Sequence, residues 1–220
     1  SFIPTCDSWT KPCLSVIKHP VVRARVMSDG CPSSPTLTAT YFIENPAKES
    51  YEVPVISIVT EPDNFFDKEE GIYVKGKNVN YSQRGKQWER PVHLTIFDQN
   101  GQAVLRQNAG ARIHGGGSRA RPQKSLRLYA REEYGEEAFL YPFFADKPEV
   151  DSFRTLILRT VLDWSGTLFK EELCHHLVRD MQTDYMAGQT VIVFINGEYW
   201  GIHNIREKYN EDFLAHHHSV

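Results

Sequence analysis

Residues 111–131, ARIHGGGSRARPQKSLRLYAR, constrain the fold of this chain more than any other stretch. A short apolar run leads into three consecutive glycines, Gly115 to Gly117, and a second strand-like run begins at Lys124. Two such runs predict antiparallel strands joined by a loop. Consecutive glycines leave backbone N–H groups open to a ligand, and such concavities bind anions. The stretch therefore indicates either a plain flexible hairpin or a hairpin whose loop holds an anion.

Charge and strand periodicity favour an anion site. No acidic residue occurs between Asp98 and Glu132, whereas this interval holds seven arginines and lysines. In a strand, Lys124 shares one face with Leu126 and Leu128, and a lysine is costly to bury there unless it meets an anion. We therefore predict a phosphate-sized anion site formed by the glycine loop and an inward Lys124. The spacing is neither that of a P-loop nor G-x-G-x-x-G, and a solvated basic surface remains the alternative.

Composition places the chain among soluble globular proteins. It has 220 residues, 40% hydrophobic and 24% charged, with a net charge of −3. The charge argues against a general binder of nucleic acid or anionic membranes. No apolar run approaches the roughly 18 residues of a membrane span. The first residues, SFIPTCDSWT, lack the basic and apolar regions of a signal peptide, so we expect any targeting signal to have been removed.

The cysteines and histidines predict no metal site. Cys6, Cys13 and Cys31 lack C-x-x-C spacing, so a zinc site is not indicated. A Cys6–Cys13 or a Cys13–Cys31 disulfide is open if the protein is exported. Cys174 falls on a predicted helix and is expected to be a buried free thiol. The clusters His175-His176 and His216-His217-His218 are expected to lie on the surface, and His114 is assigned no role.

The order of elements predicts an α+β fold with a mostly antiparallel sheet and one main helix. Asn196-Gly197, flanked by apolar runs, is a strong hairpin signal. Strands are predicted at 16–27, 36–43, 53–60, 72–74, 91–98, 102–115, 124–129, 153–160 and on both sides of Asn196-Gly197, and a final helix begins near residue 210.

The main helix follows residue 164 and is capped by Ser165 or Thr167. Its predicted buried face has an apolar residue every four positions, with Glu171 at the edge and Glu172 on the opposite side. The apolar residues of that face are Phe169, Leu173, Leu177 and Met181, with Cys174 and Val178 beside them.

Four motifs resemble the spore-coat CotH family of atypical secretory protein kinases over about residues 53–220. They are GIYVKG (71–76), the 111–131 stretch, LRTVLDW (158–164) and VFINGEYWGIHNIREKYNEDFL (193–214). The segment VVRARVMSDGCPSSPTLTATYFI (21–43) resembles the end of a chitobiase C-terminal-like β-sandwich. Together these resemblances divide the chain into a partial sandwich (1–45), a linker (46–52) and a kinase-like N-terminal lobe (53–220).

The CotH resemblance implies a site for the phosphates of ATP. Lys124 would hold the phosphates and Glu171 would orient it, so these two side chains should be in contact. The glycine loop, Ser118 and Arg119 would lie over the phosphates, and Glu207 would approach the adenine. Magnesium or manganese would accompany ATP, with carboxylate ligands from residues beyond this chain. Asp163 receives no defined role, and Arg112 and Arg127 are expected to be solvated.

The resemblance also implies a function, with alternatives left open. The chain would be the N-terminal part of a bacterial-type kinase that phosphorylates a protein outside the cytoplasm. Alone it should not transfer phosphate, and a second copy or a swapped segment should cover its exposed apolar face. One alternative is a cell-surface or coat module that binds glycan or protein without catalysis. Another is a purely structural coat protein.

Overall fold

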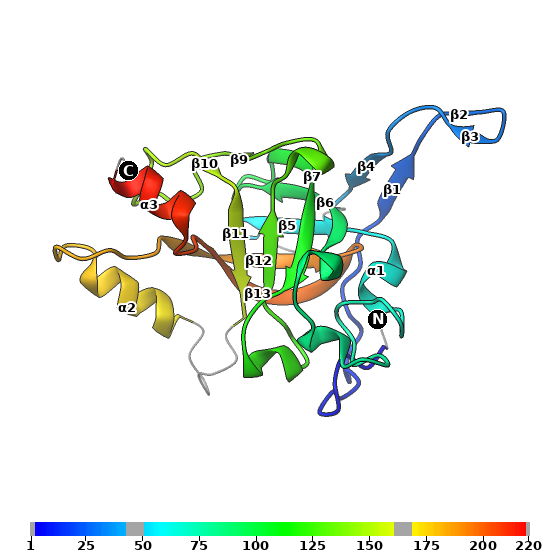
Figure 1. Ribbon diagram of the computed structural model, residues 1–220, viewed down its shortest axis with the longest axis horizontal. Helices are drawn as coiled ribbons and strands as arrows, with labels where there is room; N and C mark the ends of the chain where they lie inside the picture. Colours follow the sequence, from blue (N-terminus) through cyan, green and yellow to red (C-terminus); the bar gives the residue numbers. More distant parts are fainter. Residues whose placement is uncertain (1–2, 43–50, 161–168, 219–220) are drawn as a thin grey trace.

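The computed structural model describes residues 3–42, 51–160 and 169–218, and its centre is a β-barrel (Figure 1). The barrel strands are β5 (Val55–Val59), β6 (Arg90–Phe97), β7 (Ala103–Ile113), β8 (Leu126–Tyr129), β11 (Thr155–Arg159), β12 (Gly188–Ile195) and β13 (Glu198–Arg206). The helices are α1 (Pro62–Phe66), α2 (Lys170–Val178) and α3 (Glu211–His218). Short strands are β1 (Val21–Ala24), β2 (Met27–Ser28), β3 (Cys31–Pro32), β4 (Leu37–Thr40), β9 (Phe139–Leu140) and β10 (Ser152–Phe153).

The barrel closes in the order β11-β13-β12-β5-β6-β7-β8, because β8 pairs with β11 as well as with β7. Its strand pairs are antiparallel apart from the parallel pair of β5 and β12. The predicted α+β class with a mostly antiparallel sheet is confirmed. Closure of that sheet into a barrel is a feature that the sequence did not predict.

The barrel interior is filled by alternate residues of each strand, as the period of two requires. On β8, Leu126 and Leu128 are both 0% exposed. They pack in one cluster with inward residues of the other strands, among them Ile56, Ile58, Leu94, Ile113, Leu156, Leu158, Val193 and Ile205. This apolar filling holds the strands in register and leaves the remaining side chains on the outside.

The outside of β7, β8, β11 and β13 carries an unusual density of arginine. Arg112 on β7 lies opposite Arg127 on β8, and Arg127 lies opposite Ile157 on β11. Ile157 in turn pairs with Arg206 on β13, so the three arginines form one row across the strands. Arg159 follows two residues after Ile157 and therefore faces the same way. We call Arg112, Arg127, Arg159 and Arg206 the arginine face.

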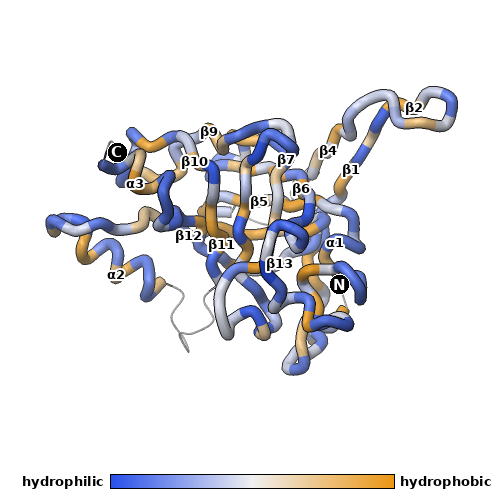
Figure 2. The backbone as a smooth tube through the Cα atoms, viewed as in Figure 1, coloured by the Kyte–Doolittle hydropathy of each residue, from blue (hydrophilic) through white to orange (hydrophobic). Residues whose placement is uncertain are grey.

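A two-stranded hairpin of β1 and β4 projects from the barrel, with β2 and β3 at its tip (Figure 1). Its base contacts β5 through a hydrogen bond between Thr40 Oγ1 and Ser57 Oγ (2.7 Å). Nearby, the rings of His19 and Phe42 pack against Phe194. The tube in Figure 2 shows mixed hydropathy along this arm, in which β1 is largely exposed whereas Thr38 and Thr40 of β4 are buried.

Two local predictions are wrong. Residues 72–74 are buried but form no strand, because the N–H groups of Ile72 and Tyr73 bond to the carbonyl oxygens of Asn64 and Phe65 in α1. Cys174 is exposed rather than buried.

All four cysteines belong to the described residues, and all are free thiols. Neither of the disulfides that the sequence left open, Cys6–Cys13 and Cys13–Cys31, is therefore present in the structure. In the part of the chain that the structure describes, no helix is long and apolar enough to cross a membrane.

Candidate functional site

Lys124 lies inside the end of the barrel, immediately before β8. It is 0% exposed, and its ammonium group donates a hydrogen bond to Arg121 O. The same nitrogen sits 4.6 Å from the centre of the Tyr81 ring and 5.3 Å from that of Tyr73. Burial lowers the pKa of Lys124 to about 8. The inward orientation is confirmed. Aromatic rings and a backbone carbonyl lie around the ammonium group, and the contact of Lys124 with an anion stays a prediction.

Glu171 is not the partner of Lys124. Its Oε1 lies 2.7 Å from Arg206 Nη1, and its Oε2 lies 3.2 Å from Arg159 Nε. Burial alone would raise the pKa of Glu171, but the two arginines hold it below its ordinary value. The predicted contact with Lys124 is therefore wrong, because Lys124 points into the barrel whereas α2 lies against its outside.

The orientation of α2 corrects a second prediction. Glu172 packs against β12, so closely that a Cβ on Gly188 would lie 2.3 Å from Glu172 Oε2. Leu173 and Leu177, on the predicted buried face, are 42% and 68% exposed. The helix therefore turns Glu171 and Glu172 toward the barrel, and the leucines of its apolar face point away from it. Burial raises the pKa of Glu172 to about 7.

The glycine loop begins where β7 ends. Gly115 has φ +111°, a conformation that L-residues rarely adopt, and its Cβ position would lie 2.4 Å from Ser118 Oγ. Gly116 and Gly117 face open space, since nothing lies within 4 Å of their Cβ positions. A ligand can therefore approach the backbone of these two glycines closely.

Arg119 fastens this loop to the rest of the protein. The residue is 7% exposed, and its Nε donates to Gly115 O at 2.6 Å. Its Nη1 donates to Tyr81 O at 3.2 Å and to Gln83 O at 2.9 Å. The guanidinium is turned to these three carbonyls, and the position of Arg119 over the phosphates stays a prediction.

Replacing Arg119 with alanine is expected to lower the free energy of unfolding by about 3 kcal/mol, because charge-assisted hydrogen bonds to three carbonyls are lost. Equilibrium urea unfolding measures this change. Arg121→Ala, two residues away and exposed, is the control and should change stability by less than about 0.5 kcal/mol. An equal effect of the two substitutions would contradict a fastening role for Arg119.

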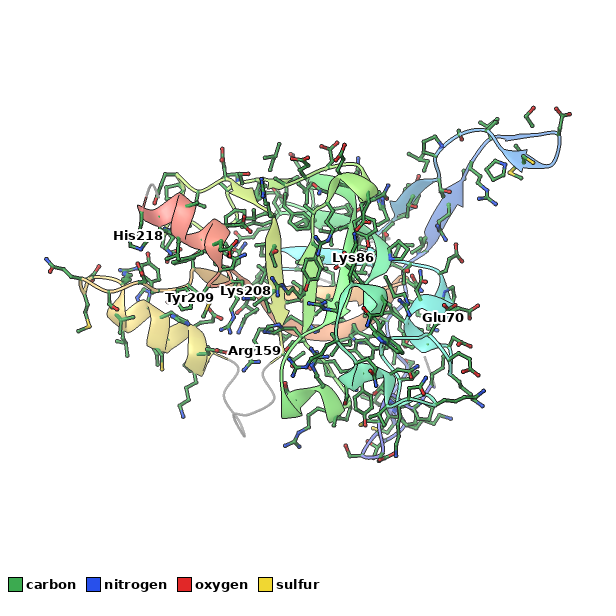
Figure 3. All side chains as sticks on the ribbon, viewed as in Figure 1. Glu70, Lys86, Arg159, Lys208, Tyr209 and His218 are labelled. Atoms are coloured by element: carbon green, nitrogen blue, oxygen red, sulfur yellow. The ribbon has the colours of Figure 1, made fainter. Side chains whose placement is uncertain are left out.

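His114 follows β7 at the start of the glycine loop, where burial and nearby cations both act on its pKa. Burial, and after it the charges of Arg159, Arg127, Arg206 and Lys208, lower its pKa to about 4. Figure 3 shows Arg159 at the end of β11 nearest α2, with Lys208 in the segment that leads to α3. The loop and the arginine face thus form one electropositive surface, on which Glu171 is paired with two of the arginines.

Glu207 follows β13 and is 3% exposed. Its Oε2 accepts from Lys147 Nζ and from the backbone N–H of Ala187, both at 2.8 Å. Its Oε1 lies 2.8 Å from His217 Nε2 on α3. These contacts hold α3 and the start of β12 together, so the carboxylate of Glu207 stabilises the fold. Its place beside adenine stays a prediction.

Some predicted features fall outside the structure. Asp163, Trp164 and the helix caps Ser165 and Thr167 lie in residues 161–168, which are not described. Within the described residues, no three His, Cys, Asp or Glu side chains are grouped so that they could hold a metal ion.

Comparison with known protein families identifies the family of this chain. The family described as CotH kinase protein matches residues 111–220, which include the glycine loop, Arg159, Glu171 and Arg206. A search of curated proteins finds no match.

Proposed function

Because the chain belongs to the family of CotH kinase proteins, we propose that it forms the nucleotide-binding part of an ATP-dependent phosphotransferase. The observation that carries the proposal is the pairing of Glu171, on a helix, with Arg159, on a strand, beside an open glycine loop. In protein kinases a glycine-rich loop covers the phosphates, and a cation on the third strand pairs with a helix glutamate.

The order of elements supports the proposal. Counted from the strand before the glycine loop, β7 is first, β8 second and β11, with Arg159, third among the barrel strands. The helix with Glu171 comes next, followed by the β12–β13 hairpin and the segment that leads to α3. A kinase-like N-terminal lobe presents its parts in this order, with lysine where this chain has Arg159.

We assign the phosphates of ATP to the space between the glycine loop and Arg159. The N–H groups of Gly116 and Gly117 would face the phosphates, and the guanidinium groups of Arg159 and Arg206 would neutralise them. Glu171 orients both arginines. Lys124 then supports the loop from inside the barrel, which differs from the role that the sequence suggested for it.

The remaining parts of the function are proposals that the family membership supports. The acceptor would be a protein outside the cytoplasm. Magnesium or manganese ions that accompany ATP need carboxylate ligands, and we assign none to the described residues. For this reason binding, rather than turnover, is the suitable readout for this chain.

Arg159→Gln is expected to weaken binding of a fluorescent ATP analogue tenfold or more, because a charge-assisted hydrogen bond contributes about 1.5–3 kcal/mol. Fluorescence anisotropy in the presence of magnesium measures the affinity. Arg154→Gln is the matched control, since this arginine flanks the same strand but has a side chain 66% exposed. Its affinity should equal that of the unmodified chain.

The same assay tests whether Arg159 or Lys124 is the cation that binds the phosphates. Lys124→Met should bind the analogue as the unmodified chain does. If a folded Lys124→Met protein loses binding while Arg159→Gln keeps it, the inward lysine holds the phosphates. If neither the unmodified chain nor any variant binds nucleotide, the glycan-binding or structural alternatives are favoured.

A further inference from the structure

Tyr129 is surrounded by three guanidinium groups. The Cζ atoms of Arg112, Arg127 and Arg131 lie 5.2, 4.8 and 4.8 Å from the centre of the Tyr129 ring. Arg112 also donates a hydrogen bond to the phenolic oxygen. Each cation–π contact is favourable by itself, but three like charges on one ring repel one another. We call these four residues the Tyr129 cluster.

One guanidinium of the cluster has a clear carboxylate partner. Arg131 Nε and Nη2 lie 3.0 and 3.3 Å from Oε1 and Oε2 of Glu89, whose side chain is 1% exposed. Among the described residues, Arg112 and Arg127 form no ion pair. Three guanidinium groups and one buried carboxylate give the half-buried cluster a net charge of about +2. One bound dianion would balance this charge.

The strand register makes this excess charge costly. Arg112 and Arg127 are direct partners across the β7–β8 pair, and like charges directly opposite each other destabilise a sheet. The Nε of Arg127 is buried and has no hydrogen-bond partner among the described residues. The two arginines were expected to be solvated, but both are half-buried. An anion between the two guanidinium groups would offset their repulsion and accept from the buried Nε.

Ligands can reach the cluster through an open groove of about 600 Å³ that Arg127, Tyr129 and Arg131 line. Of the five carboxylates that line the groove, two lie near cations of the same lining. Glu133 Oε2 lies 2.9 Å from Lys86 Nζ, and Asp212 lies 3.9 Å from Arg154. Glu133 also lies 3.8 Å from Arg131. Glu132, Glu137 and Glu211 complete the acidic part of the lining.

We propose that the Tyr129 cluster binds a phosphate dianion between Arg112 and Arg127. Planar guanidinium groups match phosphate oxygens by paired hydrogen bonds. The position is distinct from that of the nucleotide phosphates, which we place at Arg159 and Arg206. Free inorganic phosphate and a phosphoserine side chain present the same chemistry, and the experiment distinguishes the two sources.

Titration calorimetry with inorganic phosphate near pH 7.5 tests the proposal. Arg112→Gln and Arg127→Gln are each expected to weaken phosphate binding at least tenfold, whereas Arg154→Gln on the groove rim should leave it within twofold. The ATP analogue should bind Arg112→Gln and the unmodified chain equally, so failure of this proposal and failure of the nucleotide site can be told apart.

A stability measurement excludes a merely structural role. In phosphate-free buffer, Arg127→Gln should melt at the same temperature as the unmodified chain or higher, because a repulsion is removed. Added phosphate should raise the melting temperature of the unmodified chain and leave that of Arg127→Gln unchanged. Arg131→Gln breaks the pair with Glu89 and should lower the melting temperature under both conditions.

Two results would overturn the proposal. One is equal phosphate binding by the unmodified chain and an Arg112→Gln/Arg127→Gln double variant. The other is loss of phosphate binding in Arg159→Gln alone.

A serine peptide and its phosphorylated form identify the source of the phosphate group. Binding of the phosphopeptide at least tenfold tighter than inorganic phosphate, lost in Arg127→Gln, assigns the site to a phosphorylated protein. Equal affinities assign it to the free anion.

Discussion

Lys147→Met is expected to lower the free energy of unfolding by about 4 kcal/mol, the largest effect of any substitution considered for this chain. Lys147 and Glu207 are 6% and 3% exposed, and their charged atoms are 2.8 Å apart. Removing the lysine leaves a buried carboxylate without its main counter-charge. The rings of Tyr185 and Phe213, 4.1 and 5.1 Å from the ammonium, lose a cation as well.

Urea unfolding followed by circular dichroism measures this loss, and Lys18→Met is the matched control. Lys18 and Glu198 form an ion pair of 3.0 Å, but the lysine side chain is 65% exposed. An exposed pair contributes less than about 1 kcal/mol because water and salt screen it. A loss for Lys147→Met no greater than that for Lys18→Met would contradict the structural role of Glu207.

Lys124→Met is expected to raise the free energy of unfolding at pH 7 by about 2 kcal/mol. Burial lowers the pKa of Lys124 from 10.5 to about 8, which corresponds to at most about 3 kcal/mol of unfavourable burial of the charged form. The substitution removes this unfavourable burial, but it also removes the hydrogen bond to Arg121 O, and that loss costs about 1 kcal/mol. A methionine fits the volume and keeps the contacts with Tyr73 and Tyr81.

The pH dependence gives this prediction a second readout. Below pH 8 Lys124 is charged in both states, so the cost of burying the charge is fully present. Between about pH 8 and 10.5 the unfolded chain keeps the proton that the folded chain has lost, and stability therefore rises with pH. The difference in stability between the unmodified chain and Lys124→Met should shrink over this interval. A constant difference would show that Lys124 is not buried as a cation.

Much of the barrel is predictable from strand periodicity. The alternation in residues 91–98 and in the runs beside Asn196-Gly197 indicates which side chains share a face, and β6, β12 and β13 follow these runs. The turn itself is local chemistry, since Asn196 and Gly197 both have positive φ, 50° and 78°. The inward direction of Lys124 follows from the same alternation of side chains, since Lys124 shares a face with Leu126 and Leu128.

The pairing of Glu171 could not be read from the sequence. The alternation of residues 155–159 places Arg159 opposite to Leu156 and Leu158, so an outward arginine was a signal available in the sequence. The sequence does not indicate on which side of the sheet α2 packs. The apolar periodicity of the helix predicted the wrong face: Glu171 contacts two arginines of the barrel, and Leu173 and Leu177 are exposed.

What the sequence by itself determined is local: the strand runs, their alternating faces, the Asn196-Gly197 turn and the open glycine loop. Each depends on residues a few positions apart, where backbone sterics and a fixed side-chain period act directly. The tertiary structure alone decided the closure of the barrel through β8 and β11 and the parallel pairing of β5 with β12. It also decided that Arg112 meets Arg127 and that Arg159 and Arg206 meet Glu171. These contacts depend on the register of the paired strands and on the side of the barrel where α2 lies, and no local pattern encodes either of them.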